Sequence, residues 1–510
     1  MLRNSSNDRR RWIFLGILVA ALCPASSVSA QGGPYMPGEI QIRLREGALI
    51  DSVNARHGTQ TQDSLPPLYL LTLPEVGYEQ QWIDRFMLDP DVDAAEFAWT
   101  DETPEGARQM VVIVVGGTID DYLDQGLLGR LHIDEMQQHY TGAGALVAVL
   151  DTGVMASHEA LAGCIATGGW DFVSNDDDPA DEALGVDEDG DGLTDEGAGH
   201  GTMVAGILHV LAPDAQILPV RVLDDEGRGR VFDVAKGMRY AVDHGAQVIN
   251  LSLGLAQHTF VIQDQIFYIN ENEAAIVSAA GNLATDHPPY YPASDPRALS
   301  IAALDSCDIK ADFSNWHPTV DLSAPGIGIL APYRDGGYAI GAGTSFSVPF
   351  VSAQCAWALQ AMPNVTLLNL YRTAREGVVD IYDIPENLPY LGQLGSGRID
   401  GLATLAAIQS TSCGIETDVA ALPGVLRAWP NPSRDGETVF LQPAEPAAAA
   451  GSRILILDLS GRCVGTALRA GDDPVLRWSW QSDGSALPGG VFFARPDGGA
   501  GRPVRLVHIR

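Results

Sequence analysis

Five short, nearly uninterrupted apolar runs between residues 145 and 407 constrain the fold most strongly. They are Ala145–Leu150, Gln216–Val222, Gln247–Leu251, Ala275–Ala279 and Leu299–Ala303. Runs without the alternation of a half-exposed strand are typical of parallel strands that are buried on both faces. The segments between them have helical spacing, and Val231–Asp243 ends at His244-Gly245, where a glycine suits a left-handed helix C-cap. The pattern predicts an α/β domain with a parallel sheet.

Three polar segments fall at the ends of these strands or at the starts of helices. Asp151 follows the first apolar run, His200 opens a segment with the pattern of an apolar helix, and Ser345 comes just before another segment with a helical pattern. Taken singly, each has a structural explanation as a turn former, a structural histidine or a helix N-cap. Right-handed crossovers bring the loops that follow parallel strands to one edge of the sheet, where α/β proteins build their sites.

Taken together, these segments resemble the motifs of the subtilisin-like serine peptidases, the subtilases. The resemblance rests on Asp151, on Gly199-His200-Gly201-Thr202 and on Gly343-Thr344-Ser345-Phe346-Ser347-Val348-Pro349. Their order of aspartate, histidine and serine is that of subtilisin itself. Other family blocks are similar to Leu251-Ser252-Leu253-Gly254, Ala279-Ala280-Gly281-Asn282, Tyr291-Pro292-Ala293, Phe313-Ser314-Asn315 and Leu322-Ser323-Ala324-Pro325-Gly326.

The resemblance implies a role for each of these residues. Ser345 would be the nucleophile, His200 the general base and acid, and Asp151 the group that orients the histidine. Asn282 would donate to the oxyanion. The substrate would lie along Leu251, Ser252, Leu253, Gly254, Ala280 and Gly281.

Two departures from the family pattern lie beside these residues. Met203 replaces the histidine most common after Gly-His-Gly-Thr, and Phe346-Ser347-Val348 replaces the frequent Met-Ala-Thr. These departures bear on the assignment to a subfamily rather than on the roles of Asp151, His200 and Ser345. The sedolisins share a similar serine motif but use glutamate as the base, so His200 argues against that family.

Acidic residues dominate the charge, with 65 Asp and Glu against 31 Lys and Arg and a formal net charge of -34. Such a balance repels a phosphate backbone, which excludes nucleic acid as a natural partner. Twelve of the acids lie in residues 171–197, which contain no Lys or Arg. This connection leads directly into Gly199-His200.

Part of this acidic connection has the spacing of a calcium-binding loop. Positions 1, 3, 5 and 9 of an EF-hand-type loop are acidic and position 6 is Gly192, although Ala198 stands where a bidentate Glu is usual. The spacing predicts a structural calcium site, with a solvated acidic loop as the alternative and no organic cofactor. The expected ligands are Asp187, Asp189, Asp191, Leu193 through its carbonyl, Asp195 and Glu196.

The first thirty residues have the features of a secretory signal. Arg9–Arg11 precede the apolar run Ile13–Leu22, and Val28-Ser29-Ala30 suits cleavage. That run is too short to span a bilayer core of ~30 Å, and no later segment is long enough, so we expect no transmembrane helix. These features predict a secreted or cell-surface protein. The cysteines beyond the signal are odd in number and scattered, so their pairing stays open.

The flanking segments predict two further units. Residues 38–98 have the pattern of a small α+β unit and resemble the family's inhibitor-type propeptide, which would be the enzyme's own inhibitor; a permanently attached domain is the alternative. After Cys413 the chain becomes rich in Pro, Gly and Ala, and short β-type runs predict an all-β sandwich. This tail resembles the sorting domains of type IX secretion substrates and the immunoglobulin-like domains of flagellar-hook capping proteins, so secretion machinery is a possible partner and an ordinary appendage the alternative.

The sequence thus predicts a secreted serine endopeptidase that cleaves proteins or peptides and is synthesised as a zymogen. The alternative is a catalytically silent subtilase-like surface or binding protein. The expected boundaries are residues 1–30 for the signal, 31–107 for the propeptide, 118–412 for the peptidase domain, 413–424 for a linker and 425–510 for the β-sandwich.

Overall fold

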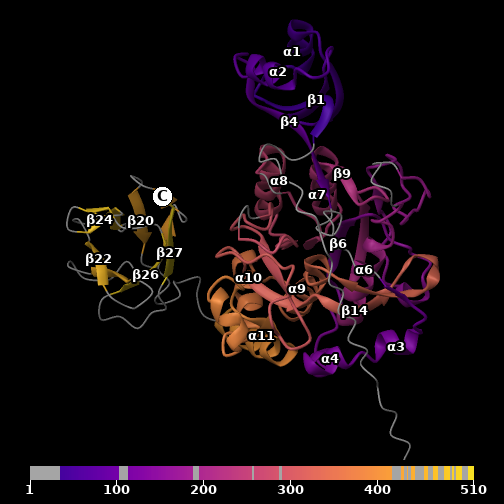
Figure 1. The fold of residues 1–510 in the computed structure, drawn as a ribbon, viewed down its shortest axis with the longest axis vertical. Coiled ribbons are helices and arrows are strands. Elements are labelled where there is room, and N and C mark those ends of the chain that lie inside the picture. The colour runs from indigo at the N-terminus through magenta and orange to yellow at the C-terminus, as the bar shows by residue number, and fades with distance from the viewer. Residues whose placement is uncertain are drawn as a thin grey trace, which may run out of the picture. The chain divides into compact units, whose positions relative to one another are not determined.

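The computed structural model describes residues 35–102, 113–187, 194–255, 258–286 and 290–415, and beyond these a set of strands between residues 427 and 509 (Figure 1). The chain divides into two compact units, Met1–Ile408 and Gln409–Arg510. Within the described residues, no helix is long and apolar enough to cross a membrane. The predicted signal segment lies outside the described residues.

A nine-stranded sheet forms the centre of the larger unit (Figure 1). In spatial order its strands are β16 (Val378–Val379), β17 (Arg398–Ile399), β13 (Leu322–Pro325), β12 (Leu299–Leu304), β11 (Ala275–Ala279), β10 (Val248–Leu251), β6 (Leu146–Asp151), β8 (Gln216–Arg221) and β7 (Trp170–Asp171). Neighbouring strands are parallel, except β16 and β17 at one edge. The parallel sheet predicted from the apolar runs is confirmed.

Helices cover both faces of this sheet. One face packs against α6 (His200–Leu211), α9 (Val348–Ala361) and α10 (Leu367–Glu376), and the other against α7 (Val231–Asp243) and α8 (Phe260–Glu271). Along β6, Val147 and Val149 belong to the first apolar core, whereas Ala148 and Leu150 belong to the second. A strand buried on both faces needs apolar residues at successive positions, which explains the uninterrupted runs.

The carboxyl ends of the central strands bring the chemically interesting segments to one edge. Asp151 is the last residue of β6, Ser252 follows β10, and Ala280 follows β11. The three strands are neighbours in the order β11, β10, β6, with Leu251 in register with Leu150. The loops after these strands therefore lie side by side.

Shorter elements complete the core of this unit. They are α3 (Ile119–Leu123), α4 (Gly126–Arg130), α5 (Ile133–Gln137), a 3₁₀ turn at Thr344–Phe346, and a three-stranded sheet of β14 (Ile327–Pro332), β15 (Tyr338–Ala342) and β5 (Ile113–Val115). Helix α11 (Gly401–Ile415) extends past residue 412, the predicted end of the peptidase domain, into the predicted linker at 413–424. The rest of that linker lies outside the described residues.

The N-terminal part of the larger unit has its own small core. Its elements are β1 (Tyr35–Leu44), α1 (Ile50–His57), β2 (Gln60–Leu65), β3 (Leu68–Thr72), α2 (Glu79–Phe86) and β4 (Val92–Glu102). The strands follow the order β2-β3-β1-β4, and Ile40, Ile42, Val53 and Phe86 are fully buried between sheet and helices. Residues 35–102 are called the N-terminal lobe below.

The N-terminal lobe contacts the rest of the unit through its sheet. Strand β4 pairs with β9 (Arg228–Arg230), and Arg43 Nη1 lies 2.8 Å from Asp264 Oδ1 on α8. Glu96 accepts a hydrogen bond from Thr259, which caps the N-terminus of α8, and a second bond of 2.8 Å from Gln41. Burial raises the pKa of Glu96 to about 7.

The described elements beyond residue 415 are all strands. They are β18 (Arg427–Trp429), β19 (Ser433–Arg434), β20 (Thr438–Gln442), β21 (Arg453–Leu457), β22 (Cys463–Leu468), β23 (Leu476–Ser479), β24 (Gln481–Ser482), β25 (Ser485–Ala486), β26 (Gly490–Pro496) and β27 (Val504–Ile509). They form sheets of order β18-β20-β23, β19-β27-β26-β21-β22 and β24-β25, with antiparallel pairing except between β19 and β27. This part of the chain is therefore β-type, as its turn-rich sequence indicates.

Candidate active site

Asp151 and His200 form a buried pair where β6 ends and α6 begins. His200 Nδ1 lies 2.6 Å from Asp151 Oδ1, and both side chains are fully buried. A carboxylate can only accept a hydrogen bond, so the contact requires the proton on Nδ1. Nε2 is then the ring nitrogen that can take up a proton.

Glycines allow this close contact between the helix and the strand end. A Cβ on Gly201 would lie 2.1 Å from the carbonyl oxygen of Gly153, in the turn that follows β6. Gly199 has a φ of +93° and its Cβ would lie 2.2 Å from the ring of Tyr333. Any larger residue at either position would push the first turn of α6, and His200 with it, away from Asp151.

Ser345 lies in the 3₁₀ turn immediately before α9 and is tied to the loop after β10. Its Oγ donates to the carbonyl oxygen of Ser252 at 3.0 Å, and Ser252 Oγ donates to the carbonyl oxygen of Ser345 at 2.9 Å. On the other side, the ring of Phe346 lies 5.4 Å from that of His200, measured between centroids. These contacts bring the predicted serine, histidine and substrate-binding segments to one place.

Asn282 lies in the loop after β11, and Thr344 fixes the orientation of its amide. The backbone N–H of Thr344 donates to Asn282 Oδ1 at 2.9 Å, and Thr344 Oγ1 donates to the same oxygen at 2.8 Å. Because a backbone N–H can only donate, its partner must be the amide oxygen. The donating Nδ2 is therefore the other branch of the side chain, which takes no part in these two contacts with Thr344.

Asn315 braces the loop that carries Asn282, a role not assigned from the sequence. Its Nδ2 donates to the carbonyl oxygen of Ala280 at 2.9 Å, and its Oδ1 accepts from the N–H groups of Leu283 and Thr285 at 3.0 and 3.2 Å. Asn315 belongs to a motif with family resemblance, but its partners are some thirty residues away in sequence. No local pattern identifies such a contact.

The ring of Tyr290 bridges two of the predicted substrate-binding segments and was also missed. A Cβ on Gly254 would lie 2.8 Å from Tyr290 Cδ1, and a Cβ on Gly281 would lie 2.3 Å from Tyr290 Cδ2. These ring carbons are on opposite edges, so the buried ring spans the gap between the two glycines. The only sequence signal was its position beside Tyr291-Pro292-Ala293.

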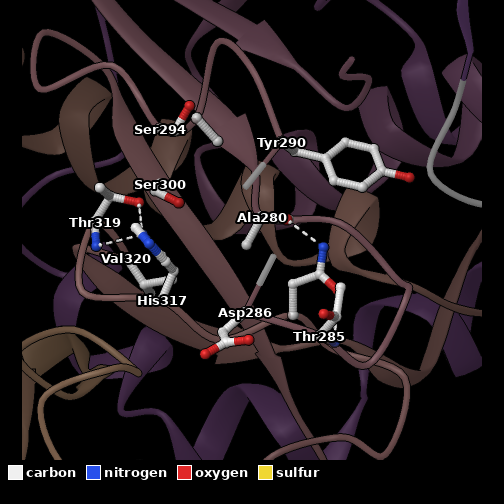
Figure 2. Close-up of a pocket in the computed structure, with 11 residues that line it drawn as sticks. Ala280, Thr285, Asp286, Tyr290, Ser294, Ser300, His317, Thr319 and Val320 are labelled. Carbon is white, nitrogen blue, oxygen red and sulfur yellow. Dashed lines mark hydrogen bonds between the residues drawn. The ribbon is translucent and has the colours of Figure 1, made fainter. Parts of the chain in front are cut away.

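A pocket lies next to Tyr290 and is lined in part by the loop that follows β11. Figure 2 shows Ala280 near its centre, with Tyr290 to one side and His317 and Thr319 to the other. Its lining is mostly small or polar and includes Ser294 and Ser300. Tyr290 and the segment bearing Asn282, through Ala280, therefore both line this pocket.

Only part of the predicted calcium loop can be compared with the structure. Asp189, Asp191 and Leu193 lie outside the described residues, which contain no group of three or more His, Cys, Asp or Glu side chains able to hold a metal. Asp195, which is described, accepts a hydrogen bond of 2.8 Å from Gly185 N–H. Burial, and to a smaller degree Asp195, raises the pKa of Asp225.

Comparison with known proteins identifies the family. The profile of the subtilase family matches residues 142–376. Thermitase from Thermoactinomyces vulgaris is 40% identical over 221 residues, which are 41% of this chain and 73% of thermitase. The chain belongs to the subtilase family. Its enzyme class is that of a subtilisin-like serine endopeptidase.

Other relatives of this subtilase agree with the assignment. The thermophilic serine proteinase of Bacillus sp. (strain AK1) is 37% identical over 224 residues, 42% of this chain and about half (52%) of that protein. Among solved structures, fervidolysin from Fervidobacterium pennivorans, a keratinolytic enzyme related to subtilisin, matches with a TM-score of 0.61 and 20% identity. The match covers 91% of this chain and 71% of fervidolysin, and it supports the fold alone.

Proposed function

We propose that this subtilase is a secreted endopeptidase that hydrolyses peptide bonds through an acyl-enzyme on Ser345. His200 acts as general base and then general acid, and Asp151 orients the imidazole and stabilises its protonated form. The buried 2.6 Å contact between His200 Nδ1 and Asp151 carries the proposal, because it leaves Nε2 to receive the serine proton.

The reaction follows from the groups at the strand ends. Ser345 Oγ attacks the substrate carbonyl carbon while His200 takes the proton of the serine hydroxyl. In the resting enzyme this hydroxyl donates to the carbonyl oxygen of Ser252. The Asn282 amide and the Ser345 N–H stabilise the oxyanion, and losing one such donor costs roughly 10²–10³ in turnover, a value known from subtilisin itself. The leaving amine takes the proton from His200, and water then repeats the sequence to release the acyl group.

A fluorophosphonate probe tests this proposal, because it reacts only with an activated serine. We expect the mature enzyme to be labelled, and Ser345→Ala to abolish both labelling and hydrolysis of casein. Ser174→Ala, which changes an exposed serine, is the matched control and should be labelled normally. Absence of labelling in the parent after removal of the N-terminal lobe would instead favour the silent surface or binding protein.

Tyr290 is expected to limit the size of the substrate side chain that can bind next to the scissile bond. The side chain of the residue whose carbonyl is attacked enters the space between the proposed binding segments Ser252–Gly254 and Ala280–Gly281. The ring of Tyr290 fills the gap between Gly254 and Gly281, so small side chains should be preferred there. Tyr290→Ala opens this gap.

For Tyr290→Ala we predict that kcat/KM for a phenylalanine peptide anilide rises by roughly tenfold or more relative to the alanine analogue. Tyr290→Phe keeps the ring and should retain the parent's preference. An unchanged ratio in Tyr290→Ala would show that the ring does not limit the substrate.

We further propose that the N-terminal lobe is an inhibitory propeptide that is removed on maturation. Its sheet pairs with β9, and its contacts with α8 include the Arg43–Asp264 ion pair and the buried Glu96. Because burial raises the pKa of Glu96 to about 7, protonation favours the assembled state. This stabilisation is full below the ordinary pKa of a glutamate and is lost as pH rises through about 7.

Release of the N-terminal lobe should therefore be faster at pH 8 than at pH 6. In the Ser345→Ala chain cleaved after the lobe, dissociation measured by surface plasmon resonance should show this dependence, and Glu96→Gln should remove it.

N-terminal sequencing of the secreted active enzyme should give a sequence that begins beyond Phe97. Retention of residues 37–97 in active enzyme would support the permanently attached domain instead.

We also propose that calcium binds the acidic connection through Asp187, Asp189, Asp191, the Leu193 carbonyl, Asp195 and Glu196. Oxygen donors at this spacing suit a hard divalent cation, and the charge accumulated at Asp195 and the buried Asp225 would be relieved by one. When bound, the ion supplies positive charge that steadies the segment leading into His200.

Isothermal titration of the Ser345→Ala chain should detect calcium binding in the micromolar to millimolar range. Asp191→Asn should weaken it, whereas Asp177→Asn, which changes an exposed acid of the same connection, should not. A chain that releases no heat with calcium has a solvated acidic loop.

For the β-type tail, we propose a sorting role on the basis of its resemblance to sorting domains, with an ordinary appendage as the alternative.

A further inference from the structure

Asp181 is an acidic residue of the connection that turns inward and binds the backbone on both sides of His200. Its Oδ1 accepts from the N–H of Gly199 at 2.8 Å. Its Oδ2 accepts from the N–H and the hydroxyl of Thr202, at 3.2 and 2.5 Å. One carboxylate thus holds the residue before His200 and the residue two positions after it.

The start of α6 needs such an acceptor from elsewhere in the chain. The first N–H groups of a helix have no partner within the helix, and an N-cap side chain usually supplies one. Here the N-cap is Gly199, which has no side chain and cannot be replaced because of its φ of +93° and the contact with Tyr333. Thr152 Oγ1 accepts from the N–H of Gly201 at 3.1 Å, and Asp181 accepts from that of Thr202.

The same network reaches the carboxylate that orients His200. The N–H of Thr152 donates to Asp151 Oδ1 at 2.8 Å, and Thr152 Oγ1 lies 3.5 Å from Asp181 Oδ1. Thr152 therefore stands between the two carboxylates. Any displacement of Asp181 acts on the helix start and on the surroundings of Asp151 together.

We propose that Asp181 is a positioning residue for the general base, holding the first turn of α6 so that His200 meets Asp151. This inference rests on the proposed function of His200. It makes the acidic connection part of the active-site support, because Asp181 belongs to that connection and bonds directly to the residues around the base.

The charge of Asp181 gives this role a signature in the pH profile. Burial, and to a smaller degree the neighbouring Asp151, raises the pKa of Asp181 to about 6, so the carboxylate is ionised above that pH. The titratable groups that interact with it are Asp151 from β6 and Tyr333 after β14, and its bond to the N–H of Gly199 places it one residue from His200. A negative charge there favours protonated His200, so its removal should move the acid limb of kcat/KM to lower pH.

Two substitutions with a matched control test the proposal in the mature enzyme. Asp181→Ala removes both acceptors, and Asp181→Asn keeps the size of the side chain but only one acceptor oxygen and no charge. Asp177→Asn removes the same charge from an exposed position of the same connection. Active sites are titrated with the fluorophosphonate, and kcat and KM are measured from pH 5 to 9.

We expect kcat per titrated site to fall roughly tenfold to hundredfold in Asp181→Ala and less in Asp181→Asn, because a small displacement of the base slows proton transfer. KM should stay within about twofold, because Asp181 touches none of the proposed substrate-binding segments. The acid limb should move to lower pH in both variants, and Asp177→Asn should match the parent. Asp181→Asn should keep the parent's thermal midpoint at pH 8, because burial of the charged carboxylate is unfavourable above its pKa.

The proposal is overturned if kcat per titrated site and the acid limb are unchanged in both Asp181 variants. A loss confined to the number of active sites, with a lower thermal midpoint, would also overturn it, because that is a structural role alone. The low-field proton resonance of His200 Nδ1–H needs no activity and separates this inference from the proposed function. It should broaden or shift in Asp181→Ala, and an unchanged resonance would count against Asp181 even if the parent were inactive.

Discussion

The contact between the start of α6 and the end of β6 is the constraint on which the site depends. A buried carboxylate is costly unless it has hydrogen-bond partners, and Asp151 Oδ1 accepts from both His200 Nδ1 and the N–H of Thr152. The contact is possible only because Gly201 lets the helix approach the carbonyl of Gly153. The glycines of the Gly-His-Gly motif are therefore packing requirements that serve the histidine between them.

The other candidate groups are held by contacts that cross between loops. Ser345 is bound to the loop after β10 by two hydrogen bonds with Ser252, and Asn282 is oriented by Thr344. Asn315 forms hydrogen bonds with backbone N–H and carbonyl groups of the turn that follows β11, which carries Asn282. Each of these three side chains thus has its orientation fixed by a neighbour, which is the preorganisation that acyl transfer requires.

The strongly negative charge of the chain has more than one structural role. In residues 171–197 several acids are exposed, but Asp171 forms a buried ion pair with Arg221, and Asp181 caps α6. An isolated buried carboxylate would be unfavourable, so both inward-facing acids have cationic or N–H partners. Net charge alone describes solubility, whereas these two residues tie the connection to the sheet and to the helix that carries His200.

The sequence by itself predicted the parallel sheet, because buried strands require successive apolar residues, and it placed Val231–Asp243 in a helix with the observed bounds. It also predicted a site at the segments around Asp151, His200, Asn282 and Ser345, because their local motifs are distinctive. The N-terminal lobe and the β-type tail were visible as changes in pattern. All of these signals are carried by residues close together in the chain.

Only the tertiary structure decided the tautomer of His200, the bracing by Asn315, the ring of Tyr290 between two glycines, and the capping of α6 by Asp181. Asp181 is one of twelve acids in its connection, and no spacing distinguishes it from the exposed Asp177. The physical reason is that these contacts join residues far apart in sequence. Their partners become defined only when the sheet and its helices have packed.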